Sequence, residues 1–551
     1  MSIVGNSIAP PDERAGLSRR HLLALSGAAS AAALLAGGAV VQAAEIEELR
    51  IGCFTEPPSL DPHWQNTAAS NSLSQHIFDR LFHADENQKP VPALAEGWKV
   101  IDPLTWEIAL RKDVKFHDGT PFTADDVLFT FERSQNVPNS PFSFKSYLGN
   151  KKLEKVDDHL IRITTPSPNP ILINEIMTVS IISKRVGEKA TTDDYNRGTA
   201  MVGTGPYRFV EWRSGQHIRL ERNEGYWGKK PEWMQVTLRP ISSNPARVAA
   251  LLSGDVELID FVPPSSLERL QSNKALSLSS KVSNRMIYLA FDHSRVRSPF
   301  AKGIDGSEID NPLRKLEVRQ AISKAINREA IGSRALEGMG VPAGQLVPPE
   351  IFGSAPELGP DKFSVADAKA LLTKAGYPNG FAITLHSSND RYVNDAAVAE
   401  AIAQMLTRIG IRTAVETMPY SVFVPRATGG GPEGLSQFSL FLYGFGGQTG
   451  EASVALRSVV ATYDKGKGLG SSNRGRYSNP EVDKLISQAS QELDDTKRAA
   501  LMAEATRISM ADVAVAPIYF PVNYWSTKKG MTYRARTDER TLAMDTLGGQ
   551  G

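Results

Sequence analysis

Side chains that could do chemistry are few and scattered in this sequence. It holds no G-x-S-x-G nucleophile motif, no H-E-x-x-H metal motif and no G-x-x-x-x-G-K-S/T phosphate loop. No histidine lies three or four residues from another, so no two can bind a metal from one helix face. His117-Asp118-Gly119 places a base beside an acid, but this sequence is typical of a tight turn. The sequence therefore predicts no enzyme, no metal site and no cofactor.

Composition narrows the class of protein further. The 551 residues include 62 basic and 61 acidic side chains, and this balance argues against nucleic acid as the main partner. A chain of this length is expected to form three or four structural units, and its 41% hydrophobic residues are enough to give them hydrophobic cores. The single cysteine, Cys53, excludes a disulfide within the chain and any multi-cysteine metal site. Cys53 is expected as a small buried residue of the first strand.

The first 43 residues have the layout of an export signal. Arg19 and Arg20 stand just before an uncharged apolar stretch from Leu22 to Val41, followed by VQA at residues 41–43 as a cleavage site. The paired arginines resemble a twin-arginine signal. We therefore expect residues 1–43 to direct export to the periplasm. A retained membrane anchor is the alternative, since about 20 apolar residues can span a bilayer.

Strand and helix patterns alternate in the second half of the sequence. Residues 381–385 (FAITL) predict a strand, residues 395–409 an amphipathic helix and residues 411–417 the next strand. Gly410 stands where a glycine commonly ends a helix. This unit predicts parallel strands with a right-handed crossover. Helices are also expected at residues 318–331, 480–493 and 496–510.

Shorter strand patterns fill the first half. Thr123 before an Ala-Asp-Asp sequence predicts the N-cap of a helix. No repeat of 20–50 residues and no low-complexity linker occurs, so interleaved units are expected. Strands are expected at residues 48–54, 105–110, 205–222 and 234–241.

Four stretches in order along the chain closely resemble one protein family, the extracellular solute-binding proteins of family 5. These proteins are the receptors of peptide/nickel-type ABC importers. Together the stretches extend the resemblance over residues 46–530. Most of these residues are expected to be scaffold, with Trp98 and Trp106 in the core. The stretches are residues 92–98 (PALAEGW) with 110–127 (LRKDVKFHDGTPFTADDV), 202–207 (VGTGPY) with 220–227 (LERNEGYW), 319–326 (RQAISKAI) and 476–483 (RYSNPEVD).

The resemblance implies an α/β fold of the periplasmic-binding-protein type. Two lobes would close on a ligand about a hinge, and the first lobe would carry an extra subdomain. The large lobe would comprise residues 44–284 and 522–551, and the small lobe residues 293–513. Crossing strands are expected near residues 284–292 and 514–522, because both are extended apolar runs long enough to pair.

The resemblance also points to ligand-binding residues. In peptide-binding members an aspartate holds the ligand's free amine, and in the dipeptide receptor an arginine holds its carboxylate. The arginine segment resembles residues 391–394 (RYVN), which makes Arg391 the foremost ligand candidate. A guanidinium group matches a carboxylate in a bidentate pair. A solvated arginine at a helix N-terminus is the alternative, although its charge there is unfavourable to the helix dipole.

The sequence departs from the family at the amine-binding aspartate. Residues 438–443 predict a strand, and Gly447 or Gln448 stands where the acid is expected; Glu451, three residues further on, is a candidate substitute. The ligand is therefore expected to carry a carboxylate but to lack the conventional amine contact, as in a modified peptide or an amino-acid conjugate. Tyr443 and Phe445 are expected to line the cleft as apolar walls, and further candidates for ligand contact are Gln448, Arg285, Tyr288 and Glu56.

The expected function is reversible capture of a small solute or short peptide in the periplasm and its delivery to the permease subunits of an ABC importer. No chemistry on the ligand, no cofactor and no nucleic acid is expected. Two alternatives remain open: a receptor for a metal chelate such as one of nickel, with the chelate held by Arg391, and a periplasmic enzyme on the same scaffold.

Overall fold

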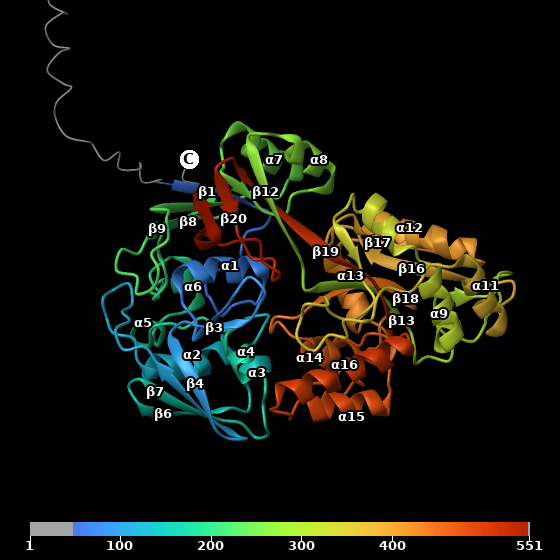
Figure 1. Ribbon diagram of the computed structural model, residues 1–551, viewed down its shortest axis with the longest axis horizontal. Coiled ribbons are helices and arrows are strands. Elements are labelled where there is room, and N and C mark those ends of the chain that lie inside the picture. Colours follow the sequence, from blue (N-terminus) through green and yellow to red (C-terminus); the bar gives the residue numbers. More distant parts are fainter. Residues whose placement is uncertain (1–47, 549–551) are drawn as a thin grey trace, which may run out of the picture. The chain divides into compact units, whose positions relative to one another are not determined.

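Thirteen strands form the main sheet of the computed structural model, which describes residues 48–548 (Figure 1). The expected export signal, residues 1–43, lies outside the described residues. The strand order is β14-β16-β18-β13-β19-β11-β1-β10-β9-β8, with β12 and β15 paired to β19 and β17 paired to β16. The fold is therefore mixed α/β, as the sequence predicts.

The first half-sheet, as we call it, contains β1 and β8–β12. β1 pairs in parallel with both β10 and β11, and β9 pairs antiparallel with β8 and β10. The predicted strands of this region are confirmed; Cys53 ends β1 half-buried rather than fully buried. The bounds are β1 (Glu48–Cys53), β8 (Tyr207–Arg213), β9 (His217–Arg222), β10 (Gln235–Pro240), β11 (Leu258–Ile259) and β12 (Leu276–Val282), with helices α7 (Asn244–Ser253) and α8 (Pro264–Ser272).

The second half-sheet contains β13–β18. Its predicted strand–helix–strand unit is confirmed, because β16 and β17 pair in parallel on either side of α12. Gly410 follows that helix with a φ of 101°, a conformation that glycine adopts without strain. The bounds are β13 (Arg285–Phe291), β14 (Ala301–Lys302), β15 (Gly340–Pro342), β16 (Phe381–Ser388), β17 (Ile411–Met418) and β18 (Leu440–Gly446), with α11 (Val365–Lys374), α12 (Asp395–Arg408) and α13 (Tyr420–Thr428).

One long strand, β19 (Val515–Lys528), belongs to both half-sheets (Figure 1). Its first residues pair with β13 and β15, and its last residues pair with β12 and β11. The second connection runs from β12 through Ser283 and Asn284 into β13. Two neighbouring segments thus carry the chain from one half-sheet to the other.

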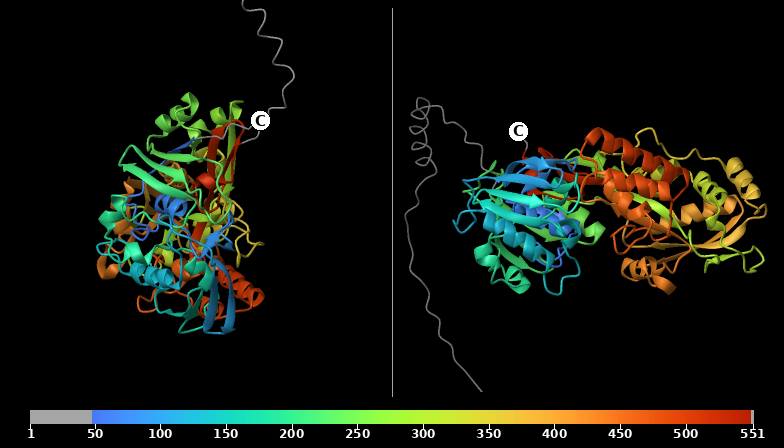
Figure 2. Two further views of the ribbon diagram at one scale, coloured as in Figure 1. Left: turned by 90° about the vertical axis from the view of Figure 1, so that its left-hand side faces the viewer. Right: turned by 90° about the horizontal axis from the view of Figure 1, so that it is seen from below.

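A separate four-stranded sheet, in the order β4-β5-β7-β6, packs against α2 (Figures 1 and 2). Thr123 is the N-cap of α2, as predicted, and its backbone N–H donates to the carboxylate of Asp126 at 2.9 Å. Trp106 lies in the core, but Trp98 is 45% exposed, because β4 is paired on one side only and its outer face is uncovered. The bounds are β4 (Ala95–Asp102), β5 (Thr105–Leu110), β6 (Lys152–Asp157), β7 (Leu160–Thr164) and α2 (Ala124–Gln135).

The predicted helix over residues 318–331 is broken in two. α9 (Leu316–Ala325) ends at Ile326, and Asn327 caps a new turn, α10 (Arg328–Ala330), by accepting a hydrogen bond from the backbone N–H of Ala330. The other two predicted helices are α15 (Pro480–Ala489) and α16 (Asp495–Ala511), which lie side by side (Figure 2).

Shorter elements complete the described part of the chain. None of its helices is long and apolar enough to cross a membrane. The short elements are α1 (Ala68–Ile77), α3 (Lys145–Leu148), α4 (Leu172–Ile176), α5 (Lys184–Gly187), α6 (Thr192–Asn196), α14 (Ala452–Ala455), β2 (Phe82–Ala84), β3 (Pro90–Pro92), β20 (Met531–Tyr533), β21 (Thr546–Gly548) and the short helical turns η1 (Pro312–Arg314), η2 (Ile331–Ala335), η3 (Pro432–Gly434), η4 (Leu456–Val460) and η5 (Ala543–Asp545).

Candidate functional site

A cleft of about 1090 Å³ is lined by loops from both half-sheets. Such a volume suits a ligand the size of a short peptide, since ligand pockets commonly measure about 300–1,000 Å³. The first half-sheet contributes residues 53–58 after β1 and residues 260–264 after β11. The second contributes residues 389–397 between β16 and α12, and Asp538, Glu539 and Thr541 of the C-terminal segment also line the cleft.

Three residues of the cleft wall have left-handed backbone conformations without being glycine. The φ angles are 45° at Phe261, 51° at Asn394 and 64° at Glu539. For a bulky residue such as Phe261 this conformation is uncommon and costs free energy. Strained residues of this kind gather at ligand sites, where the surrounding structure holds them in place. The cleft is therefore our candidate binding site.

Arg391 lies in this cleft, in the loop between β16 and α12. Its side chain is exposed, and its guanidinium carbon lies 5.4 Å from the ring centroid of Tyr392 and 5.5 Å from that of Tyr420. Within residues 48–548, no carboxylate forms an ion pair with Arg391. The carboxylate of Asp395 instead accepts from the backbone N–H groups of Arg391 and Tyr392, which fixes the loop. The guanidinium group is thus oriented by aromatic rings and open to a ligand anion.

Arg285 also lines the cleft but already has a partner. Its Nε and Nη2 atoms donate to the two carboxylate oxygens of Glu539 at 3.2 and 2.9 Å. Burial alone would raise the pKa of Glu539, but the charge and hydrogen bonds of Arg285 lower it to about 2. The same pair raises the pKa of Arg285 against the effect of burial. Arg285 is therefore part of the cleft wall and is neutralised by Glu539.

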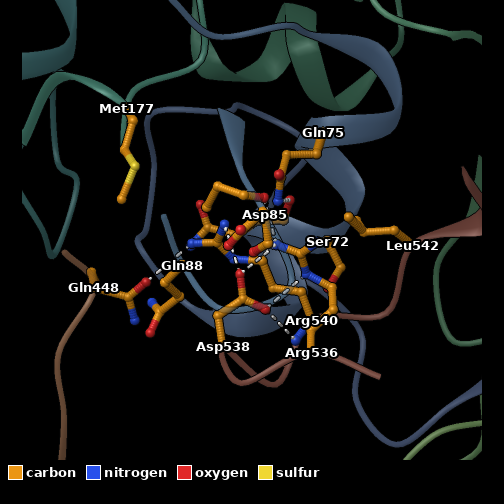
Figure 3. Close-up of polar contacts among 12 residues, drawn as sticks. Ser72, Gln75, Asp85, Gln88, Met177, Gln448, Arg536, Asp538, Arg540 and Leu542 are labelled. Atoms are coloured by element: carbon orange, nitrogen blue, oxygen red, sulfur yellow. Dashed lines mark hydrogen bonds and ion pairs between the residues drawn. The ribbon is translucent and has the colours of Figure 1, made fainter. Parts of the chain in front are cut away.

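Glu56 and Gln448 line the cleft with their polar atoms in use. Glu56 accepts hydrogen bonds from the indole N–H of Trp212 at 2.6 Å and from the backbone N–H of Gly215 at 3.1 Å, both near the β8–β9 turn. Gln448 accepts through Oε1 from Nη2 of Arg540 at 3.2 Å (Figure 3). Each of these residues thus secures a loop of the cleft wall.

Arg540 belongs to a buried charge cluster below the cleft (Figure 3). Arg536 binds Asp538 in a bidentate pair at 3.0 and 2.9 Å, and Arg540 approaches the same carboxylate at 3.3 Å. Burial would raise the pKa of Asp538, but the two arginine charges lower it. A glutamine at position 448 satisfies Arg540 with a neutral acceptor.

Glu451, the candidate substitute for that aspartate, is committed elsewhere. Its carboxylate is buried and accepts from Nη1 of Arg498 at 2.6 Å. It does not line the cleft. The expectation that Glu451 could take the amine-binding role is therefore wrong in this structure, because its charge is already compensated by a helix residue of α16.

Tyr288, Tyr443 and Phe445 lie in a hydrophobic core and not among the residues that line the cleft. Strand alternation places Tyr443 and Phe445 on the face of β18 that is covered by α13, where the ring of Phe423 stacks on Tyr443 at 5.9 Å. Tyr288 pairs with Tyr443 across β13 and β18 and is 1% exposed. These three residues therefore belong to the hydrophobic core and not to the lining of the cleft.

Asp260 is a cleft residue that the sequence did not single out. It follows the two-residue strand β11 and is 7% exposed. One carboxylate oxygen accepts from the backbone N–H of Phe54 at 2.6 Å, and the other accepts from the hydroxyl of Thr541 at 3.4 Å. Burial raises the pKa of Asp260 to about 6, although the charge of Arg247 opposes the shift. No local signal distinguishes this acid in the sequence, because its burial arises from packing of distant segments.

We expect the change Asp260→Asn to stabilise the protein without ligand at neutral pH. A pKa raised in the folded state means that the folded protein binds the proton more tightly, so stability falls as the pH rises from about 4 to about 6. A shift of about two units corresponds to about 3 kcal/mol at pH 7.5, the upper limit of the gain. Urea unfolding at pH 4 and 7.5 measures it. A gain that is equal at both values would contradict this assignment.

The described residues contain no group of three or more His, Cys, Asp or Glu side chains that could hold a metal ion. Burial strongly raises the pKa of Cys53, so this thiol at the cleft edge is held in its neutral form. The cleft offers groups for ligand recognition: the open guanidinium group of Arg391, buried carboxyl groups and walls of aromatic and proline residues.

A cleft between two α/β halves that two neighbouring segments connect is the architecture of a solute-binding protein. The model of the bacterial extracellular solute-binding proteins, family 5 (middle region), matches residues 89–467. The chain is 31% identical over 454 residues to the glutathione-binding protein GsiB of Salmonella choleraesuis (strain SC-B67), covering 82% of this chain and 84% of that protein. The chain belongs to this solute-binding family, as the resemblance implied, and acts as the binding component of an ABC importer.

Solved structures share the fold. HbpA2 from Haemophilus parasuis superposes with a TM-score of 0.78 at 24% identity, covering 91% of this chain and 99% of that one. The binding protein AgaA of A. tumefaciens R10, solved in complex with agropinic acid, superposes with a TM-score of 0.72 at 25% identity, covering 92% and 99%. These similarities confirm the periplasmic-binding-protein fold for the present chain.

Proposed function

We propose that this protein works in the periplasm, exported by residues 1–43, and captures a short peptide or peptide-like solute for the permease subunits of its importer. The observation that carries the proposal is the guanidinium group of Arg391. It faces the cleft beside two tyrosine rings and has no carboxylate partner among the described residues. A ligand carboxylate would supply that partner in a bidentate pair.

Glutathione is the first ligand to test, because the GsiB relatives bind it by name. It is a peptide-like molecule with two carboxylates and one ammonium group, and its γ-linked glutamate differs from an ordinary peptide N-terminus. That chemistry agrees with a cleft in which the uncharged Gly447 or Gln448 stands where the family's amine-binding acid is expected.

Ligand capture is proposed to close the two lobes about the segment around Asn284 and the middle of β19. Because ligand binds the folded state only, it is expected to raise the melting temperature. At a ligand concentration of about 100 times Kd the gain corresponds to about 2.7 kcal/mol. Small-angle scattering of the saturated protein is expected to give a smaller radius of gyration than the free protein. An unchanged radius at saturation would contradict closure.

Calorimetry on the purified protein with three probes tests the ligand class. The probes are glutathione, the dipeptide Ala-Ala and a nickel–histidine chelate. Binding of glutathione or Ala-Ala supports the proposal. Binding of the nickel chelate alone would replace it by the chelate-receptor alternative. Recovery of a chemically altered probe after incubation would indicate an enzyme, whereas recovery of the intact probe supports reversible capture.

A further inference from the structure

Of the six carboxylates that line the cleft in the described chain, two form ion pairs and two more are held by several hydrogen bonds. Asp538 lies between Arg536 and Arg540, and Glu539 binds Arg285. Asp395 accepts from the hydroxyl of Ser388 and from backbone N–H groups at the start of α12, and Glu56 is held by the β8–β9 turn. Each of these four carboxylates accepts at least three hydrogen bonds in the described chain.

Asp260 differs from them. It is buried, its carboxylate forms no ion pair within residues 48–548, and its second oxygen has only the 3.4 Å contact with Thr541. Arg247 lies nearby, but its three nitrogen atoms donate to the carbonyls of Asp260, Ile241 and Phe261 and to the side chain of Asn244. A buried carboxylate without an ion-pair partner is costly, and the charge of Arg247 offsets only part of this cost, so a ligand cation there would be favoured.

The surroundings of Asp260 also suit a cation. Phe54, which donates its backbone N–H to Asp260, and Phe261, the next residue, pack their rings with centroids 5.6 Å apart in the cleft wall, where the guanidinium carbon of Arg247 lies 5.2 Å from the Phe54 ring. Aromatic faces attract ammonium and guanidinium groups, most strongly where water is excluded. An acid and two aromatic residues therefore lie together at this point of the cleft, a combination that suits a ligand cation.

We infer that Asp260 is the cation-binding residue of this cleft and pairs with an ammonium group of the ligand while Arg391 binds its carboxylate. The inference rests on the proposed function for its ligand class. It places the amine site on the first half-sheet, opposite the loop of Gln448. The two half-sheets would then each hold one charged end of a zwitterionic solute, and only such a solute would link them through both contacts.

Matched ligands and variants test this assignment by calorimetry at pH 7.5. The ligand pairs are glutathione with its analogue that lacks the α-amino group, and Ala-Ala with propionyl-alanine. Asp260→Asn keeps the acceptor for the N–H of Phe54 and removes the charge. Asp113→Asn is the control, because Asp113 is an exposed acid outside the cleft lining and forms no ion pair in the described chain. Thermal unfolding verifies that each variant is folded.

The unmodified protein is expected to prefer the amine-bearing ligand about 10- to 100-fold, the usual effect of a hydrogen bond to a charged group. Asp260→Asn is expected to reduce this preference to less than about threefold, and Asp113→Asn to leave it unchanged. If Asp260→Asn keeps the full preference, the inference about Asp260 is overturned, whereas the proposed function is not. If neither amine-bearing probe binds the unmodified protein, the proposed ligand class fails and this inference falls with it.

Discussion

Glu539→Gln is expected to lower the free energy of unfolding by about 3–5 kcal/mol, the usual effect of removing one partner of a buried ion pair. The change leaves the guanidinium group of Arg285 buried and without its carboxylate, which also accepts from the hydroxyl of Ser283. Glu539 has a left-handed backbone conformation, which this pair helps to hold. Urea unfolding of the ligand-free protein measures the loss.

A surface pair provides the control. Glu357 and Arg507 form an ion pair at 2.5 Å, but the two side chains are 53% and 43% exposed. Glu357→Gln is expected to cost less than about 1 kcal/mol, because solvent screens such a pair. The pH dependence of the free energy of unfolding provides a second check. Because the pKa of Glu539 is about 2 in the folded protein, its stabilisation is present above about pH 4.5 and is lost as the pH falls towards 2. Equal effects of the two substitutions would contradict a special role for Glu539.

Local sequence patterns predicted the regular secondary structure well. The β16–α12–β17 unit follows from hydrophobic periodicity and from Gly410, and the start of α2 follows from Thr123, because caps and periodicity are properties of neighbouring residues. The helix expected over residues 318–331 shows the limit of this reasoning. Its apolar spacing continues past Ile326, yet Asn327 caps a new turn and ends the first helix.

The candidate site depended on long-range packing. Residues 534–541 (RARTDERT) look like a solvated charged segment, yet Arg536, Asp538, Glu539 and Arg540 are buried. Distant residues bind three of them: Arg285 pairs with Glu539, the carbonyl of Ala84 accepts from Arg536, and Gln448 accepts from Arg540. Alternation predicts that Tyr443 and Phe445 share a face of β18, but α13 decides that this face is covered. Arg391 was found only through the family resemblance, since an exposed arginine has no signal of its own.

Arg391→Ala is expected to weaken ligand binding by about 2–5 kcal/mol, the usual effect of truncating one side of a desolvated, hydrogen-bonded charge pair. The side chain is exposed in the cleft and has no ion pair within the described residues, so stability without ligand is expected to change by less than about 0.5 kcal/mol. Arg391→Lys is expected to restore only part of the affinity, because an ammonium group cannot form the bidentate pair. Calorimetry with the tightest-binding probe measures both.

Blocking the carboxylate of the ligand provides the decisive comparison. If Arg391 binds a carboxylate, an ester or amide of that carboxylate weakens binding to the unmodified protein but has little further effect on Arg391→Ala, since the same contact is already gone. Arg408→Ala removes the same charge from the exposed end of α12, outside the cleft, and is expected to leave affinity unchanged. Additive losses from ester and Arg391→Ala, or an alanine variant that binds as tightly as the unmodified protein, would show that the carboxylate is held by another residue.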